Sequence, residues 1–162
     1  MYWHKVTGTL SISWPNQADG TWPHLDYAGE PISQGESLIF GMIYLTDVDE
    51  LCARTKVVPG SHIIVREQVL NYPDDPRNQK LCDDIEFLGL DDAQPVTVNA
   101  GDVLLFDYLL AHSGGGQQRA EPRPVLRVGF TNGEGDLAEK RVEVPIEAQS
   151  KLSPLGISLA GL

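Results

Sequence analysis

Clusters of glycine, proline and other turn formers divide this chain into short apolar runs, and this spacing limits what it can fold into. The first run alternates strictly from Val6 to Trp14, with apolar residues or glycine at even positions and Thr or Ser at odd positions. A period of two is typical of a β-strand with two unlike faces. The next run, 37–46, is apolar throughout, which indicates a central strand covered on both faces.

Further short strands are expected at 55–58, 95–98, 102–107, 125–132 and 141–146. Between Ile63 and Ile85 the sequence is polar, tolerates a helix and is broken by Pro73 and Pro76, so only short helical turns are expected there. Closely spaced short strands with almost no helix predict an all-β sandwich or barrel. One domain at 1–146, followed by a weakly structured tail at 147–162, accounts for a chain of 162 residues.

Charge and composition exclude several classes of function. Twelve basic residues oppose 23 acidic ones, for a net charge of -11, and such a surface repels phosphate backbones, so nucleic acid is not an expected partner. The chain starts without a signal or transit pattern, and no apolar run reaches the roughly 18 residues of a membrane span. A cytoplasmic protein without a membrane partner is therefore expected. Cys52 and Cys82 are interpreted as reduced thiols that pack in the core.

Two of the four histidines lie in a pattern that suits a metal ion. His24 and Asp26 form an H-x-D pair in a long loop, and His112 follows a predicted strand far downstream. Two imidazoles and one carboxylate can occupy one face of an octahedral iron and leave the opposite face open. Residues two apart in an extended segment point the same way, so His24 and Asp26 can reach one ion. Taken alone, the pair is better explained as a loop histidine and a turn-forming aspartate.

Arg123 opens the last long strand, and Arg127 lies within that strand. Arg123 follows His112 by eleven positions, and Pro124 biases it toward an extended conformation. An arginine fork can bind both oxygens of a carboxylate, but the alternative is a surface arginine paired with Glu121. Arg127 would face the same side of the strand as Arg123. It could bind an anionic group of a co-substrate or substrate, or pair with a buried acid.

Two further sets of residues have a structural and a functional interpretation. The polar face of the first strand is either a solvated face or the lining of a pocket, of which the solvated face is the commoner outcome. The tryptophans are interpreted as packing residues rather than as stacking platforms for a substrate. The polar set is Thr7, Thr9, Ser11 and Ser13, and the tryptophans are Trp3, Trp14 and Trp22.

Five motifs occur in a characteristic order: H-x-D at 24–26, V-V-P-G-S-H at 57–62, G-D-V-L-L-F-D at 101–107, His112, and R-P-V-L-R-V-G-F at 123–130. Together they resemble the phytanoyl-CoA dioxygenase family over a span from about Val6 to Phe130. Other oxygenases of the superfamily share several of these motifs, and P-G-S-H points to this branch. The resemblance implies a double-stranded β-helix, that is, a cupin-like jelly roll with a few short helical turns.

The resemblance also implies roles for individual residues. His24, Asp26 and His112 would be the iron(II) ligands at the catalytic centre, and Arg123 would pair with the distal carboxylate of 2-oxoglutarate. Ser113 and Arg127 are assigned to the same co-substrate site. Ser113 is included because the family often has a hydroxyl two residues beyond the distal histidine, where this chain has Gly114. His62 is expected to be structural rather than a fourth ligand. The implied cofactors are Fe(II), 2-oxoglutarate and O2, with ascorbate as an optional reductant.

The implied activity is hydroxylation of a small-molecule substrate, coupled to decarboxylation of 2-oxoglutarate to succinate. One alternative is a cupin-type metalloenzyme that does not use 2-oxoglutarate and in which Arg123 serves the substrate directly. Another is a metal-binding module without turnover. The family usually has a long helical region before the first strand, and here only a few residues precede it. We therefore expect an uncovered sheet face, which favours a homodimer or a shortened chain.

Overall fold

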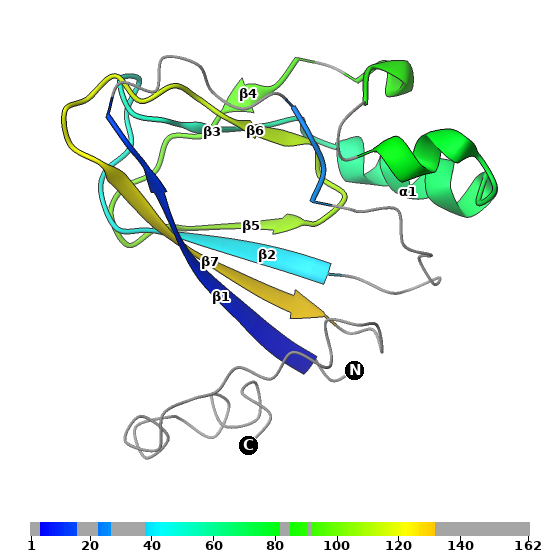
Figure 1. Cartoon of the computed structure of the whole chain (residues 1–162), viewed down its shortest axis with the longest axis horizontal. Coiled ribbons are helices and arrows are strands. Elements are labelled where there is room, and N and C mark those ends of the chain that lie inside the picture. The colour runs from blue at the N-terminus through cyan, green and yellow to red at the C-terminus, as the bar shows by residue number, and fades with distance from the viewer. Residues whose placement is uncertain (1–3, 16–22, 27–37, 82–84, 91, 132–162) are drawn as a thin grey trace.

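Two antiparallel sheets lie one above the other in the computed structural model, which describes residues 4–15, 23–26, 38–81, 85–90 and 92–131 (Figure 1). The larger sheet has the order β1-β7-β2-β5 and the smaller the order β4-β3-β6. Every neighbouring pair is antiparallel. This jelly-roll arrangement confirms the predicted fold class. The strands are β1 (His4–Ser13), β2 (Leu38–Tyr44), β3 (Thr55–Val57), β4 (Gln94–Pro95), β5 (Val103–Asp107), β6 (His112–Gly114) and β7 (Arg123–Thr131).

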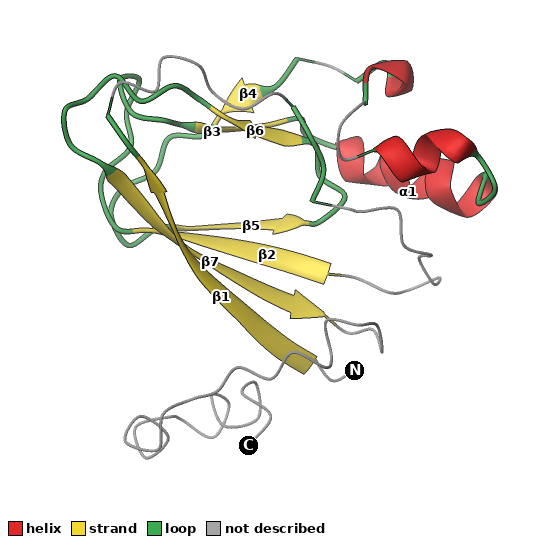
Figure 2. Ribbon diagram, in the orientation of Figure 1, coloured by secondary structure: helices red, strands yellow, loops and turns green. Residues whose placement is uncertain are grey.

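Helical segments gather at one end of the two sheets (Figure 2). They are α1 (Ser61–Asn71), η1 (Pro76–Lys80) and η2 (Glu86–Leu88). The expectation of short turns only is wrong for α1, which runs for 11 residues. Neither proline of this region lies inside α1, and burial of Val65 and Val69, one turn apart, stabilises it against the sheets. Pro76 begins η1, where proline is well tolerated.

Most predicted strands agree with the observed strands to within a few residues. The run at 95–98 is shorter than expected, because β4 ends at Pro95 and Val98 forms an isolated bridge with Val48. In the described ranges, no helix combines the length and apolar character needed to cross a membrane. Several expectations lie outside the described residues, namely those on Trp3, Trp22, Cys82, 141–146 and 147–162.

Near its end, β1 is oriented opposite to the commoner expectation, whereas Thr9 is exposed as that expectation has it and the side chain of Thr7 lies outside the described part. Leu10, Ile12 and Trp14 are 56%, 37% and 58% exposed, whereas Ser11 and Ser13 are half-buried. The prediction of a solvated polar face is therefore wrong at these two serines, and Trp14 does not pack in the core. The physical reason is that the space between the sheets holds a buried arginine, which needs a polar partner more than it needs apolar side chains.

The outer face of the larger sheet is apolar in the described part of the chain. Leu10 of β1 lies opposite Leu126 of β7, and Ile43 of β2 lies between Leu126 and Val103 of β5. Leu10 and Val103 are at least half exposed, and Leu126 is 36% exposed. The described part of this sheet therefore presents an exposed apolar face. The homodimer itself stays a prediction.

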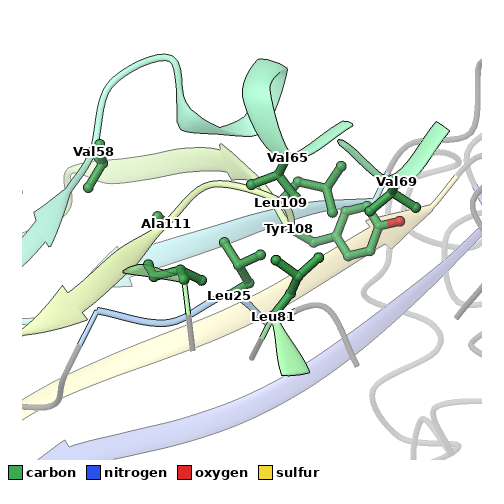
Figure 3. Close-up of a cluster of buried hydrophobic side chains, with 9 residues drawn as sticks. Leu25, Val58, Val65, Val69, Leu81, Tyr108, Leu109 and Ala111 are labelled. Carbon is green, nitrogen blue, oxygen red and sulfur yellow. The ribbon is translucent and has the colours of Figure 1, made fainter. Parts of the chain in front are cut away.

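Two hydrophobic clusters fill the interior. The first lies beside α1 and contains side chains from widely separated segments (Figure 3). The second lies between the sheets and includes Cys52, a free buried thiol as expected. The first cluster comprises Leu25, Val58, Val65, Val69, Leu81, Ile85, Tyr108, Leu109 and Ala111, and the second Met42, Tyr44, Val48, Cys52, Val98, Phe106 and Val125.

Candidate metal centre

Three predicted ligands converge between the sheets. One ligand atom from each of His24, Asp26 and His112 lies within 4.8 Å of the other two. The imidazole centroids of His24 and His112 are 4.6 Å apart, and His112 Nε2 lies 3.6 Å from Asp26 Oδ2. Cis ligands on a first-row metal ion sit about 3 Å apart when each bond is about 2.1 Å long. One ion can therefore reach all three side chains after small rotations.

A short antiparallel bridge brings these ligands together. The backbone N–H of His24 donates to the carbonyl of His112 at 2.9 Å, and the N–H of His112 donates back at 3.0 Å. Leu25 and Ala111, the neighbours of these histidines, are both buried in the cluster beside α1 (Figure 3). Successive side chains of an extended segment point in opposite directions. Burial of Leu25 therefore turns His24 and Asp26 away from the cluster and toward a common space.

Backbone contacts and burial prepare His112 to bind a cation. Its Nδ1 lies 2.9 Å from the carbonyl oxygen of Leu110, which can only accept a hydrogen bond, so the proton is on Nδ1 and the Nε2 lone pair is free. Burial lowers the pKa of His112, while the Leu110 carbonyl and Asp26 oppose this shift. The neutral ring, which is the form that binds metals, is favoured. Phe106 packs against it at 5.0 Å between centroids.

Arg127 pairs with the carboxylate of this group. Its Nη2 donates to Asp26 Oδ2 at 2.8 Å, and its guanidinium lies 5.6 Å from the centre of the Phe40 ring. The sequence leaves two interpretations open for Arg127, an anion-binding residue or a partner of an acid, and in the structure it pairs with an acid. That acid is the candidate ligand itself.

Arg123 is a buried cation with unused donors. Its side chain, at the start of β7, is 7% exposed, and Nη2 donates to Ser13 Oγ at 2.9 Å. Its Nε and Nη1 are buried without a hydrogen-bond partner in the described part of the chain. Burial lowers the pKa of Arg123, but a guanidinium remains charged at neutral pH. The alternative of a surface arginine paired with Glu121 is therefore wrong, and two free donors of a charged fork suit an anion.

Sequence reasoning missed a pair of hydroxyls beside Arg123. Tyr44 of β2 donates to Thr55 Oγ1 of β3 at 2.7 Å, which links the two sheets. The Arg123 guanidinium carbon lies 5.8 Å from the centre of the Tyr44 ring. Burial raises the pKa of Tyr44, with Thr55 and Arg123 opposing it, so the phenol stays neutral. No sequence signal pointed to Tyr44, because it lies within an apolar strand.

Two further predicted residues lie apart from the ligand group. Ser113 is 4% exposed, and as the next residue after His112 in β6 it points to the opposite face of that strand. His62 lies in the first turn of α1, and in the described part of the chain it does not belong to the group that could hold a metal.

Comparisons with known proteins agree with the observed fold and with the family that the sequence resembles. The family model of phytanoyl-CoA dioxygenase (PhyH) matches residues 4–125. The solved structure of AviO1 from Streptomyces viridochromogenes is similar with a TM-score of 0.58 at 22% identity, covering 80% of this chain and 52% of that one. The non-heme alpha ketoglutarate dependent carbocyclase SnoK from nogalamycin biosynthesis has a TM-score of 0.57 at 20% identity, covering 91% and 55%.

A third similar structure is EvdO2 from Micromonospora carbonacea var. aurantiaca complexed with 2-oxoglutarate, with a TM-score of 0.53 at 17% identity, covering 80% of this chain and 52% of that one. These likenesses show a shared fold, and the chain spans about half the length of the three proteins. A search among curated proteins finds no match. Since the family model covers most of the sequence, the chain belongs to the phytanoyl-CoA dioxygenase family.

Proposed function

We propose that this chain forms the catalytic domain of an iron(II)- and 2-oxoglutarate-dependent oxygenase that hydroxylates a small molecule. One observation carries the proposal. Two imidazoles and a carboxylate converge within 4.8 Å in the same inter-sheet space that holds a buried arginine with two free donors. The proposed ligands are His24, Asp26 and His112.

The residues fit the proposed metal and co-substrate. A set of two nitrogen ligands and one carboxylate suits non-heme iron(II) and leaves coordination positions open. Nε and Nη1 of Arg123 are buried donors without a partner in the described residues, and each can donate to an anionic oxygen. A buried cation without an anion is costly, so a ligand carboxylate would complete this site. Arg123 and Arg127 lie four positions apart in β7, about 13 Å along the strand at 3.3 Å per residue, and a co-substrate bound at the metal group would extend along this interval toward Arg123.

Each side chain contributes to binding or orientation. His24, Asp26 and His112 would hold the ion on one side, and the protonated Nδ1 of His112 keeps its ring from rotating. Arg123, held by Ser13 and packed on Tyr44, would bind the distal carboxylate of 2-oxoglutarate and orient it. Phe106 would exclude water from the His112 side. When bound, iron(II), 2-oxoglutarate and O2 supply the oxidative decarboxylation to succinate and the oxygen atom that enters the substrate.

The test is an anaerobic titration of the metal-free protein with iron(II) and then 2-oxoglutarate. We expect one ion per chain, a visible charge-transfer band on addition of 2-oxoglutarate, and succinate once air and ascorbate are admitted. Asp26→Ala should lose metal binding, whereas Asp49→Ala, at an exposed acid paired with Arg119, should not. Equal iron(II) affinity of Asp26→Ala and wild type would refute the site. Metal binding without any response to 2-oxoglutarate would instead support the cupin-type metalloenzyme or the metal-binding module.

A further inference from the structure

We propose that Arg127 is a positioning residue that orients the Asp26 carboxylate for the metal ion, rather than a binding residue for an anionic co-substrate or substrate. The inference rests on the proposed metal site and deepens it. Among the described residues, Arg127 donates a hydrogen bond to the carboxylate of Asp26.

The Asp26 carboxylate lies between the Arg127 guanidinium and the His112 imidazole. Oδ2 of Asp26 accepts from Arg127 Nη2 at 2.8 Å and lies 3.6 Å from His112 Nε2. The Asp26 side chain is 18% exposed, so water competes only weakly for these oxygens. An aspartate carboxylate, which turns about two side-chain bonds, would otherwise sample several orientations, and most of them face away from the imidazoles. The guanidinium removes that freedom before a metal arrives.

Arg127 is itself held in a rigid frame. It lies in β7, which is hydrogen-bonded to β1 on one side and β2 on the other, opposite Thr9 and Met42. Its guanidinium is within cation–π distance of Phe40, 5.6 Å from the ring centre. Asp26, in contrast, lies outside the strands of the two sheets, two residues from the His24 bridge. Arg127 thus fixes a loop ligand to a central strand.

The charges explain why this contact affects metal binding. In the metal-free protein the guanidinium neutralises a partly buried carboxylate, and in the loaded protein it hydrogen-bonds a ligand that also binds the ion. Removal of such an outer hydrogen bond typically costs about 10–100-fold in metal affinity. If Arg127 bound an anion instead, its removal would weaken 2-oxoglutarate or substrate binding and leave the affinity for the metal alone unchanged.

The experiment measures the affinity of the full chain for Co(II) alone by calorimetry, followed by the affinity of the Co(II)-loaded protein for 2-oxoglutarate. Arg127→Met keeps the apolar stem and removes the fork. We expect it to bind Co(II) about 10–100-fold more weakly than wild type, and Arg127→Lys to recover part of that loss. Arg119→Met, at an arginine paired with Asp49 on the surface, is the matched control and should bind Co(II) like wild type.

A double variant separates positioning from general destabilisation. In Asp26→Asn the acceptor has lost its charge, so adding Arg127→Met should change Co(II) affinity much less than it does in wild type. Unchanged Co(II) affinity of Arg127→Met with weakened 2-oxoglutarate binding would overturn the inference. A wild-type protein that fails to bind Co(II) would overturn the proposed function as well. Should Arg127→Met not fold, Arg127→Ala is measured in its place, and wild-type Co(II) affinity in that variant would overturn the inference alone.

Discussion

The hydroxyl of Ser61 accepts a hydrogen bond from the backbone N–H of Ala111 at 2.8 Å, and Ala111 directly precedes His112. The carbonyl of Ala111 in turn accepts from the N–H of Val58 at 2.9 Å. Gly60, with a φ of 81°, makes the left-handed turn between Val58 and Ser61. Two hydrogen bonds from the region of the P-G-S-H motif therefore hold Ala111 in place, and with it the segment that positions His112.

Loss of the hydrogen bond between Ala111 and Ser61 should lower both the stability of the fold and its affinity for a metal ion. Ser61→Ala leaves the buried N–H of Ala111 without an acceptor, which costs about 1–3 kcal/mol. We expect a lower free energy of unfolding in urea and weaker Co(II) binding, because His112 is less well held. Thr46→Val is the control, since the buried Thr46 Oγ1 has no hydrogen-bond partner in the described residues, and it should not lower stability. Equal stability of Ser61→Ala and wild type would show that the Ser61 hydrogen bond does not hold this segment in place.

Loss of the Arg123 guanidinium should separate co-substrate binding from metal binding. Arg123→Met removes the donors proposed to hold 2-oxoglutarate but none of the proposed metal ligands. We expect Co(II) affinity to stay near that of wild type, while the charge-transfer band with iron(II) and 2-oxoglutarate is lost. Because a buried, incompletely paired charge is replaced by an apolar side chain, the free energy of unfolding should not fall. A normal band in Arg123→Met would exclude this role.

The cluster beside α1 should dominate stability. Leu109 is fully buried there, so Leu109→Ala should lower the free energy of unfolding by about 2–5 kcal/mol. Leu105, on the outer sheet face, is 63% exposed, and Leu105→Ala should change it by no more than about 0.5 kcal/mol. Urea denaturation monitored by circular dichroism measures both. Similar losses in the two variants would show that the outer face is covered in solution.

The stability of the metal-free protein should fall in mild acid. In the unfolded chain His112 has its ordinary pKa of 6.5, and in the folded protein burial lowers that pKa. The unfolded state therefore takes up the proton first as the pH falls below this value. The stability contributed by the neutral ring is present above pH 6.5 and is lost as the pH falls through the folded pKa. Urea midpoints measured across this window should fall less steeply in His112→Gln than in wild type.

Local patterns in the sequence were sufficient for most of the strands and for the all-β class, whereas the candidate ligands followed from the family resemblance. Alternation, apolar runs and turn formers act over a few residues, and H-x-D places His24 and Asp26 on one side of an extended segment whatever surrounds it. These features depend on residue type and short spacing, which the amino-acid sequence contains directly.

Tertiary structure decided the rest, because periodicity defines two faces of a strand without saying which one turns inward. Ser13 lies inside and Leu10 outside, since β1 packs against a space that holds Arg123. The ion pair of Arg127 with Asp26 joins a central strand to a distant loop, and no local rule relates two such positions. Such contacts exist only once the two sheets have closed over one another.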